Sequence, residues 1–518
     1  MWQPVTAALL PFHIDKLNMV ISNSPIILFI LSIVVVTIIT SSIIAVFAFL
    51  KYERESDSTN DSPQKRRRFI LRYTGIAAFS GIVGAIGGGL STLKILEKDF
   101  VSYVINLSIS ERYKGRPPRP EGLVGIFLTW QHNPTTTMTI DWHTVRGRPS
   151  ISLLRYRRED NGSWQEIGAD SRPFPSTTDR SSIDPRTIHR AELTGLEPGT
   201  VYQFQVSGYN REYKFRTMPA EISSEKPLRF ATGGDTMTDW VALKRVNEVA
   251  MKHNLDFIHW GGDLAYADAD PNQVTDWFDW FSVNKDTLVT DEGRVIPILV
   301  AIGDHELIGE LETHDHVDYE QTDEYRKFMA PFFYELFAFP GQPGYNSLDF
   351  GNYLSFIILD SNCSNPVKGQ QTMWLEEQLA NMTERSYVFT SYHSAAFPSH
   401  KDWNKEEKVK IRDHWVPLFE EYDITFALEH GDHTYKRSKP IRELEVSEDG
   451  IQYLGDGAWG VVPRGGNNKN EWYIDQFESD RHVIIVELDG SMVDVKVINE
   501  DENIIDQFAV EGRGSSTN

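Results

Sequence analysis

The sequence predicts an α/β layered domain, preceded by an all-β sandwich and by N-terminal transmembrane helices. Three observations predict this order. Two long uncharged runs lie within the first 95 residues, short period-2 apolar runs fill residues 119–219, and strand-like runs alternate with helical patterns over residues 226–511. The chain has 518 residues, enough for several such units, and its single cysteine excludes a disulfide framework and multi-cysteine metal sites.

The pattern divides the chain into seven segments, each with its own composition. They are a tail with a first transmembrane helix (1–50, the helix at about 24–50), a basic cytoplasmic loop (51–72), a Gly-rich second transmembrane helix or export signal (73–95), a linker (96–118), the sandwich (119–219), the α/β domain (226–511) and a tail (512–518).

The first uncharged run has the length and composition of a transmembrane helix. Ile26–Leu50 is dominated by Ile, Val, Leu and Phe, and about 20 such residues span a bilayer. The loop 51–72 holds seven Lys and Arg residues, which places it in the cytoplasm and the C-terminal body outside. Alternatively, Arg66–Leu71 and the Gly-rich run after it resemble a twin-arginine export signal. Both interpretations predict that residues from about 95 to 518 lie outside the cytoplasm, and we expect the lipid bilayer to be a partner.

The charge is distributed unevenly along the chain. The first 100 residues hold 10 basic and 7 acidic side chains, which leaves 41 basic and 67 acidic side chains for the rest. Such an acidic body repels a nucleic-acid backbone, so we expect no nucleic-acid binding. The sequence does not indicate an oligomeric state.

Residues 119–219 have the pattern of an antiparallel sandwich. Apolar side chains alternate in short runs, such as Ile126, Leu128 and Trp130, that are separated by turn residues. The stretch Leu193–Tyr202 resembles the corner before the penultimate strand of fibronectin type III domains.

In the region 226–511, five apolar runs each end at residues that can bind a metal. Between some of these runs the apolar residues follow helical periodicity, after a Thr238 cap and again around Trp374. Strands that alternate with helices predict a layered α/β sheet, and such sheets bind ligands at the carboxyl ends of their strands. Oxygen and imidazole donors without thiolates suit Fe, Mn or Zn. The residues at the strand ends are Asp235, Asp263, Asp304 with His305, His393, and His430 with His433.

The motifs around these residues resemble the five blocks of calcineurin-like metallophosphoesterases. They are most similar to purple acid phosphatases, because a tyrosine, Tyr266, follows the second aspartate by three residues, and because a fibronectin-like domain precedes them. The motifs are Gly234-Asp235, Gly262-Asp263-Leu-Ala-Tyr266-Ala-Asp268, Gly303-Asp304-His305-Glu306, Tyr392-His393 and His433-Thr-Tyr435-Lys-Arg437.

The resemblance implies two metal ions, iron plus a divalent Fe, Zn or Mn ion, and a role for each matched residue. In the family pattern, Asp263 bridges the two metals. The residues implied for the first metal are Asp235, Asp263, Tyr266 and His433; those for the second are Asp263, Asp304 and His393; the implied catalytic residues are His305 and His400. The resemblance implies a phosphatase that hydrolyses phosphate monoesters with a metal-bound hydroxide, and the predicted transmembrane helix would anchor it in a membrane.

Two residues depart from the family pattern. Asp304 replaces the usual Asn, which keeps an oxygen ligand but adds a negative charge. Gly431 stands where a second-metal histidine is usual, and His430 or Asp432 could replace that ligand only if the loop shifts. We therefore expect a weak second site that Gly431→His would strengthen. Two alternatives stay open: a phosphodiesterase with the same metal core, and a degenerate ectodomain that binds ligands without turnover.

Overall fold

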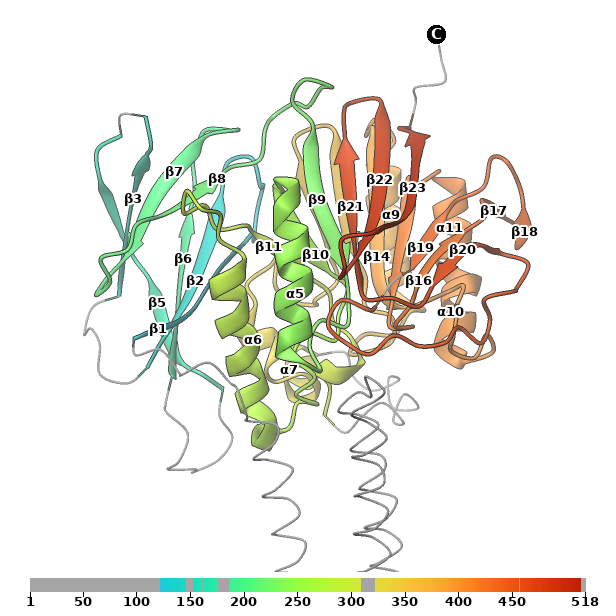
Figure 1. Cartoon of the computed structure of the whole chain (residues 1–518), viewed down its shortest axis with the longest axis horizontal. Coiled ribbons are helices and arrows are strands. Elements are labelled where there is room, and N and C mark those ends of the chain that lie inside the picture. The colour runs from blue at the N-terminus through green and yellow to red at the C-terminus, as the bar shows by residue number, and fades with distance from the viewer. Residues whose placement is uncertain are drawn as a thin grey trace, which may run out of the picture. The chain divides into compact units, whose positions relative to one another are not determined.

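The computed structural model describes residues 122–145, 152–160, 162–175, 186–308, 322–455 and 457–513 (Figure 1). Both predicted transmembrane helices and the basic loop lie outside these residues. Within the described residues, no helix is both long and apolar enough to cross a membrane.

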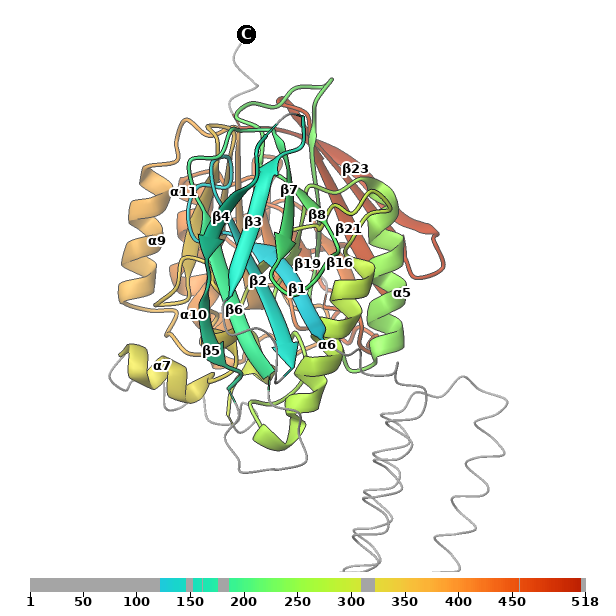
Figure 2. The same ribbon diagram turned by 90° about the vertical axis from the view of Figure 1, so that its left-hand side faces the viewer.

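The N-terminal part of the described chain consists of two four-stranded antiparallel sheets, ordered β1-β2-β6-β5 and β4-β3-β7-β8 (Figure 2). Trp130, Trp142 and Phe204 are fully or almost fully buried in one apolar core to which both sheets contribute. The strands are β1 (Leu123–Thr129), β2 (Met138–Val145), β3 (Leu153–Arg158), β4 (Gln165–Gly168), β5 (Asp170–Pro173), β6 (Arg186–Leu193), β7 (Val201–Val206) and β8 (Tyr213–Arg216).

Strand β1 is buried on both faces, which simple alternation did not predict. Ile126 and Leu128 face the core of the sandwich, whereas Phe127 faces the other way and stacks on Phe281 with ring centroids 5.4 Å apart. Phe281 belongs to helix α6 (Val274–Thr287) of the α/β domain. The sandwich and the α/β domain therefore share an apolar interface.

The α/β domain contains two larger sheets. A six-stranded sheet has the order β11-β10-β9-β21-β22-β23, in which β9, β10 and β11 are parallel and the last three strands form antiparallel pairs. Its strands are β9 (Leu228–Gly233), β10 (Phe257–Trp260), β11 (Ile298–Val300), β21 (His482–Leu488), β22 (Met492–Asn499) and β23 (Ile504–Glu511).

The second sheet has seven strands in the order β12-β13-β14-β15-β19-β16-β20, and β13, β14, β15 and β19 are parallel. Its strands, with the small pair β17–β18, are β12 (Asn346–Phe350), β13 (Leu354–Ile358), β14 (Tyr387–Ser394), β15 (Phe426–His430), β16 (Tyr435–Ser438), β17 (Ile441–Arg442), β18 (Glu445–Val446), β19 (Tyr453–Gly455) and β20 (Ile474–Glu478).

The two sheets bury aromatic side chains between them, and helices cover their outer faces (Figures 1 and 2). Phe230 stacks on Phe257 from the first sheet, and Phe230 meets Phe389 of the second sheet edge-on at 5.5 Å. The helix after β9 is capped by the side chain of Asp239, one residue later than expected. The helices are α5 (Trp240–Ala250), α6, α7 (Asp323–Met329), α8 (Phe333–Leu336), α9 (Gln370–Ala380), α10 (Glu406–His414) and α11 (Val416–Glu421), with short 3-10 turns at Met251–His253, Pro271–Gln273 and Asp304–Glu306.

Candidate metal centre

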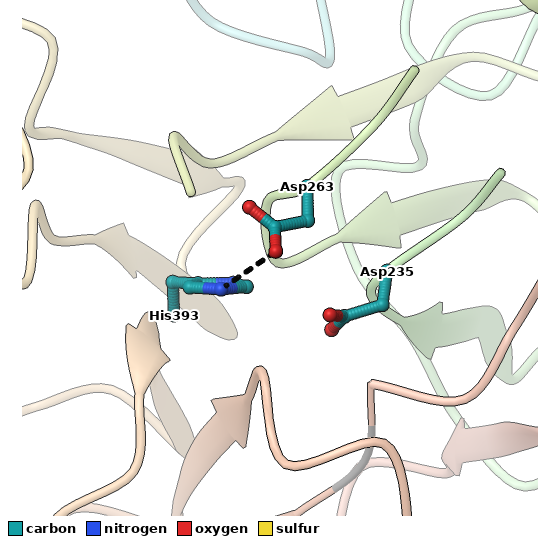
Figure 3. Close-up of side chains that lie close together, drawn as sticks. All are labelled: Asp235, Asp263 and His393. Atoms are coloured by element: carbon teal, nitrogen blue, oxygen red, sulfur yellow. Dashed lines mark ion pairs between the residues drawn. The ribbon is translucent and has the colours of Figure 1, made fainter. Parts of the chain in front are cut away.

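Three of the predicted ligands meet at the carboxyl ends of the parallel strands. Asp235 follows β9, Asp263 follows β10, and His393 lies near the end of β14. One ligand atom from each lies within 4.8 Å of the others, and all three side chains are buried. Figure 3 shows the two carboxylates and the imidazole ring directed toward a common space. The sequence prediction that strand ends from both sheets converge is therefore met for these residues.

Local backbone irregularities aim these side chains. Asp235, Asp263, Tyr266 and His433 all have left-handed backbones, with φ between 52° and 57°. Non-glycine residues adopt this conformation at a cost of about 1–3 kcal/mol each, and such strain concentrates at functional sites. His393 is the extra residue of a bulge in β14, because Tyr392 pairs with Glu429 and Ser394 pairs with the next residue of β15. Bulges of this kind re-aim one side chain out of the ladder.

Tyr266 and His433 join the cluster beside Asp235. The Tyr266 hydroxyl donates to Oδ1 of Asp235 at 2.7 Å, and Nε2 of His433 lies 2.7 Å from the same oxygen. The hydroxyl and Nε2 are themselves 3.1 Å apart. Burial and the Asp235 carboxylate hold the pKa of Tyr266 well above its usual range, so the phenol keeps its proton in the absence of a cation. Tyrosine oxygen, carboxylate and imidazole thus converge at one point.

His393 has the geometry of a metal-binding imidazole. Its Nδ1 lies 2.9 Å from the carbonyl oxygen of Gly261, which fixes the ring and leaves Nε2 facing the carboxylates. Nε2 is buried without a hydrogen bond, 3.2 Å from Oδ2 of Asp263 and 3.9 Å from Oδ2 of Asp304. A buried imidazole nitrogen that makes no regular hydrogen bond and faces carboxylate oxygens fits a metal ligand.

The electrostatics of the cluster also favour a cation. Burial alone would lower the pKa of His393, but the Asp263, Asp304 and Asp235 carboxylates outweigh it and raise that pKa to about 10. In turn, His393 and His305 hold the pKa of Asp263 well below its usual range despite its burial. Protons on the imidazoles balance the carboxylates, and a bound metal would replace the proton on its ligand.

His305 stands at the edge of the cluster, and Asp268 orients it. Nδ1 of His305 contacts Oδ1 of Asp268 at 2.5 Å, its Nε2 lies 4.0 Å from Oδ2 of Asp263, and its ring lies 4.1 Å from the Tyr266 ring. Burial opposes a proton on this ring, but Asp263, Asp268 and Asp304 raise the pKa of His305 to about 9. The sequence showed Asp268 only as a neighbour of Tyr266, with no signal of this contact.

Glu306 ties together the two loops that carry Asp263 and Asp304. Its buried carboxylate accepts hydrogen bonds from the backbone N–H groups of Asp263, Leu264 and Gly303, each at 2.8 Å. A Cβ at Gly303 would lie 2.4 Å from the Asp263 nitrogen, so this close approach requires glycine. Burial and the Asp263 charge raise the pKa of Glu306 to about 7, although the three N–H donors oppose the rise.

His430 does not lie with the cluster. Its ring packs against Gly234 and Gly261, and its Nε2 lies 3.3 Å from the Ser391 hydroxyl, between the two sheets. As a strand residue one position before Gly431, it faces the sheet interior and is not among the three residues whose ligand atoms converge, so a ligand role for it stays a prediction. Asp432 also has other partners: its Oδ2 accepts from the backbone N–H of His400 at 2.8 Å and from Ser399 at 3.3 Å.

His400 lies in the loop after β14, half-buried, and its Nδ1 has no hydrogen-bond partner. Burial and the Arg464 charge lower the pKa of His400, which keeps its ring neutral at pH 7. Lys401, which the sequence analysis did not select, follows it and places its ammonium 3.5 Å from Oδ2 of Asp304. A catalytic role for His400 stays a prediction, because its side chain makes no hydrogen bond to the ligands within the described residues.

The chain is similar to known proteins in its N-terminal domain and in sequence over most of its length. The family model for the purple acid phosphatase N-terminal domain matches residues 123–217, the extent of the sandwich. The uncharacterized protein Rv2577 of Mycobacterium tuberculosis is 26% identical over 431 residues, which cover 74% of this chain and 73% of the relative. Purple acid phosphatase 13 of Arabidopsis thaliana is 25% identical over 60% of this chain and 62% of its own length.

A solved structure shares the fold. Purple acid phosphatase PPD1 from yellow lupin (Lupinus luteus) seeds superposes with a TM-score of 0.61 at 16% identity, over 76% of this chain and 75% of the lupin chain. Together these similarities support a purple acid phosphatase-like metallophosphoesterase. In this phosphatase-like chain, the matched N-terminal domain packs beside the α/β domain whose strand ends form the metal cluster.

Proposed function

We propose that the chain hydrolyses phosphate monoesters outside the cytoplasm while it is anchored in a membrane, and that its site holds iron and a divalent Fe, Zn or Mn ion. One observation supports the reaction above all: Asp235, Asp263 and His393 bring their ligand atoms within 4.8 Å of one another, with Tyr266 and His433 beside them. Membrane anchoring rests on the uncharged run 26–50 and on the basic loop 51–72.

The residues of the chain suit a phosphoryl-transfer site. Asp235, Tyr266 and His433 would hold one metal, His393 and Asp304 the other, and Asp263 both. Two bound cations would lower the pKa of water and neutralise charge on the phosphoryl oxygens. The donor set, with one phenol and no thiolate, suits a hard trivalent ion on the Tyr266 side.

His305 supplies the proton that the leaving group needs. Asp268 holds Nδ1, so the Nε2–H of the protonated ring points into the site beside Asp263. When the ester P–O bond breaks, this N–H donates its proton to the departing oxygen and leaves a neutral imidazole that solvent reprotonates. The Asp268 carboxylate, which is not among the proposed metal ligands, favours the protonated form of this ring.

The reaction is tested with Asp263→Asn in the full-length protein. Both metals would share this carboxylate, so we expect less than a tenth of the wild-type kcat on p-nitrophenyl phosphate, with the sandwich still folded. The matched control is Asp291→Asn, which changes an exposed aspartate and should leave kcat unchanged. Retention of both metals and of most activity in Asp263→Asn would show that the site is misplaced. A wild-type protein that binds metal but hydrolyses no ester would favour the alternative of a degenerate ectodomain that binds ligands without turnover.

Location is tested with protease on intact cells. The body at residues 119–518 should be cleaved and the loop 51–72 spared, because the positive loop stays in the cytoplasm. A protected body would contradict the proposed location without bearing on the reaction.

A further inference from the structure

Carboxylates surround the place where an anionic substrate would bind. Asp235 and Asp263 converge with His393 on one small space, and Asp304 adds a third carboxylate, with its Oδ2 3.9 Å from Nε2 of His393. The rest of the body is acidic as well. A phosphate ester approaching this site therefore needs local positive charge from the protein in addition to the metals.

Lys401 supplies one such charge from the loop between β14 and α10. Its ammonium lies 3.5 Å from Oδ2 of Asp304, and its side chain is 22% exposed, so it reaches both the cluster and solvent. Within the described residues, Asp304 is the only carboxylate at ion-pair distance. An ammonium has three donors, which leaves Lys401 able to bind a second anion while it contacts Asp304.

The loop that carries Lys401 is held firmly. The side-chain amide of Asn468 donates to the carbonyl of Lys401 at 2.7 Å, and the backbone N–H of Asn468 donates to Ser399 at 2.9 Å. From the other side, Asp432 accepts the N–H of His400 at 2.8 Å. The backbone at Lys401 is thus fixed before any ligand arrives, which reduces the entropy cost of binding.

Arg464 supplies a second positive charge, beside His433 on the other side of the cluster from Asp304. Its backbone N–H donates to the carbonyl of His433 at 2.8 Å, and its Nη1 donates to the carbonyl of Gly431 at 3.2 Å. These two bonds fix the arginine to the loop that carries His433. Among the described residues, no carboxylate lies within 4.0 Å of its guanidinium, whose other N–H groups can bind oxygen.

We propose that Lys401 and Arg464 bind the non-bridging oxygens of the phosphoryl group, from the Asp304 side and the His433 side respectively, and so select dianionic monoesters over monoanionic diesters. This inference rests on the proposed function. A phosphate diester carries one negative charge fewer than a monoester. Its second ester group also occupies one of the three oxygens that are free in a monoester, so one of the two cations loses its oxygen partner. Neither residue comes from the strand ends on which the ligand prediction was based.

The test measures inorganic phosphate binding as well as turnover. Full-length protein loaded with metal is titrated with phosphate by calorimetry, for wild type, Lys401→Met and Lys401→Arg. Lys405→Met is the matched control, because Lys405 is exposed four residues away. We expect Lys401→Met to weaken phosphate binding by about tenfold to a hundredfold, the usual effect of losing a charge-assisted hydrogen bond, with the metal content unchanged. Lys401→Arg should recover most of the affinity.

Turnover provides the specificity measurement. In Lys401→Met, kcat/KM on p-nitrophenyl phosphate should fall about tenfold, whereas kcat/KM on bis-p-nitrophenyl phosphate should change less than threefold. Arg464→Met should give the same pattern. Unchanged phosphate affinity in Lys401→Met would overturn the inference. Loss of metal from Lys401→Met would also overturn it, because Lys401 would then position the metal ligand Asp304 and not bind the phosphoryl group. If the wild type binds phosphate but hydrolyses neither ester, the proposed function fails while the phosphate titration still decides the role of Lys401.

Discussion

A methyl group at Gly431 should disturb the metal centre through His393. Gly431 has φ +78°, and a Cβ there would lie 2.9 Å from Nε2 of His393 and 3.1 Å from its carbonyl oxygen. The imidazole is fully buried and held by the Gly261 carbonyl, so it can retreat only by losing that hydrogen bond. The left-handed backbone costs an alanine about 1–2 kcal/mol, and the lost bond about 1 kcal/mol more. Gly431→Ala should therefore lower the free energy of unfolding by about 2–3 kcal/mol.

Guanidinium unfolding followed by tryptophan fluorescence measures this change, and elemental analysis measures the bound metal. The matched control is Gly195→Ala, whose φ is +68° with nothing within 4 Å of the added Cβ. The control should lose only the backbone strain of about 1–2 kcal/mol and keep its metals. Equal destabilisation in both variants, with full metal occupancy in Gly431→Ala, would show that the added methyl group does not displace His393. By the same geometry, Gly431→His should lower second-metal occupancy, which replaces the expectation that a histidine there completes the site.

Three further predictions follow from other parts of the structure. If iron binds, the oxidised wild type should absorb visible light, and Tyr266→Phe should lose this band while keeping its metals; a colourless, fully active wild type would exclude a tyrosinate–ferric pair. Glu429→Gln should destabilise the α/β domain by about 3–5 kcal/mol, because it leaves the fully buried Lys436 ammonium without its ion pair, whereas the exposed Glu448→Gln should change little. Burial lowers the pKa of His189 to about 4, so the folded state binds fewer protons than the unfolded state below pH 6.5. Stability should therefore fall by about 3 kcal/mol as the pH drops from 6.5 to 4, and His189→Asn should flatten this slope.

Strand periodicity predicted the parts of the site that follow regular elements. Asp235 and Asp263 come directly after buried parallel strands, and the carboxyl ends of such strands share one edge, so their convergence could be inferred without a structure. Alternation within β15 also gave the reason to doubt His430, whose side chain faces the sheet interior.

The remaining contacts depend on tertiary structure that no local pattern encodes. Lys401 and Arg464 come from separate loops, and each is placed by hydrogen bonds to residues distant in the sequence, such as Asn468 and His433. Arg437 was part of the matched motif, yet its guanidinium pairs with Asp475 and Asp506 near the C-terminal strand, so it supports the fold. Motif position alone does not separate such a structural contact from a catalytic one.

Metal removal and restoration test the central claim most directly. The full-length protein is assayed on p-nitrophenyl phosphate as isolated, after dialysis against a chelator, and after iron and zinc or manganese are returned, with bound metal counted at each stage. If Asp235, Asp263 and His393 form the catalytic metal centre, activity should disappear with the metal and return with it, and Asp263→Asn should not recover. Activity that survives complete metal removal, or full loading of the wild type without any turnover, would contradict the account.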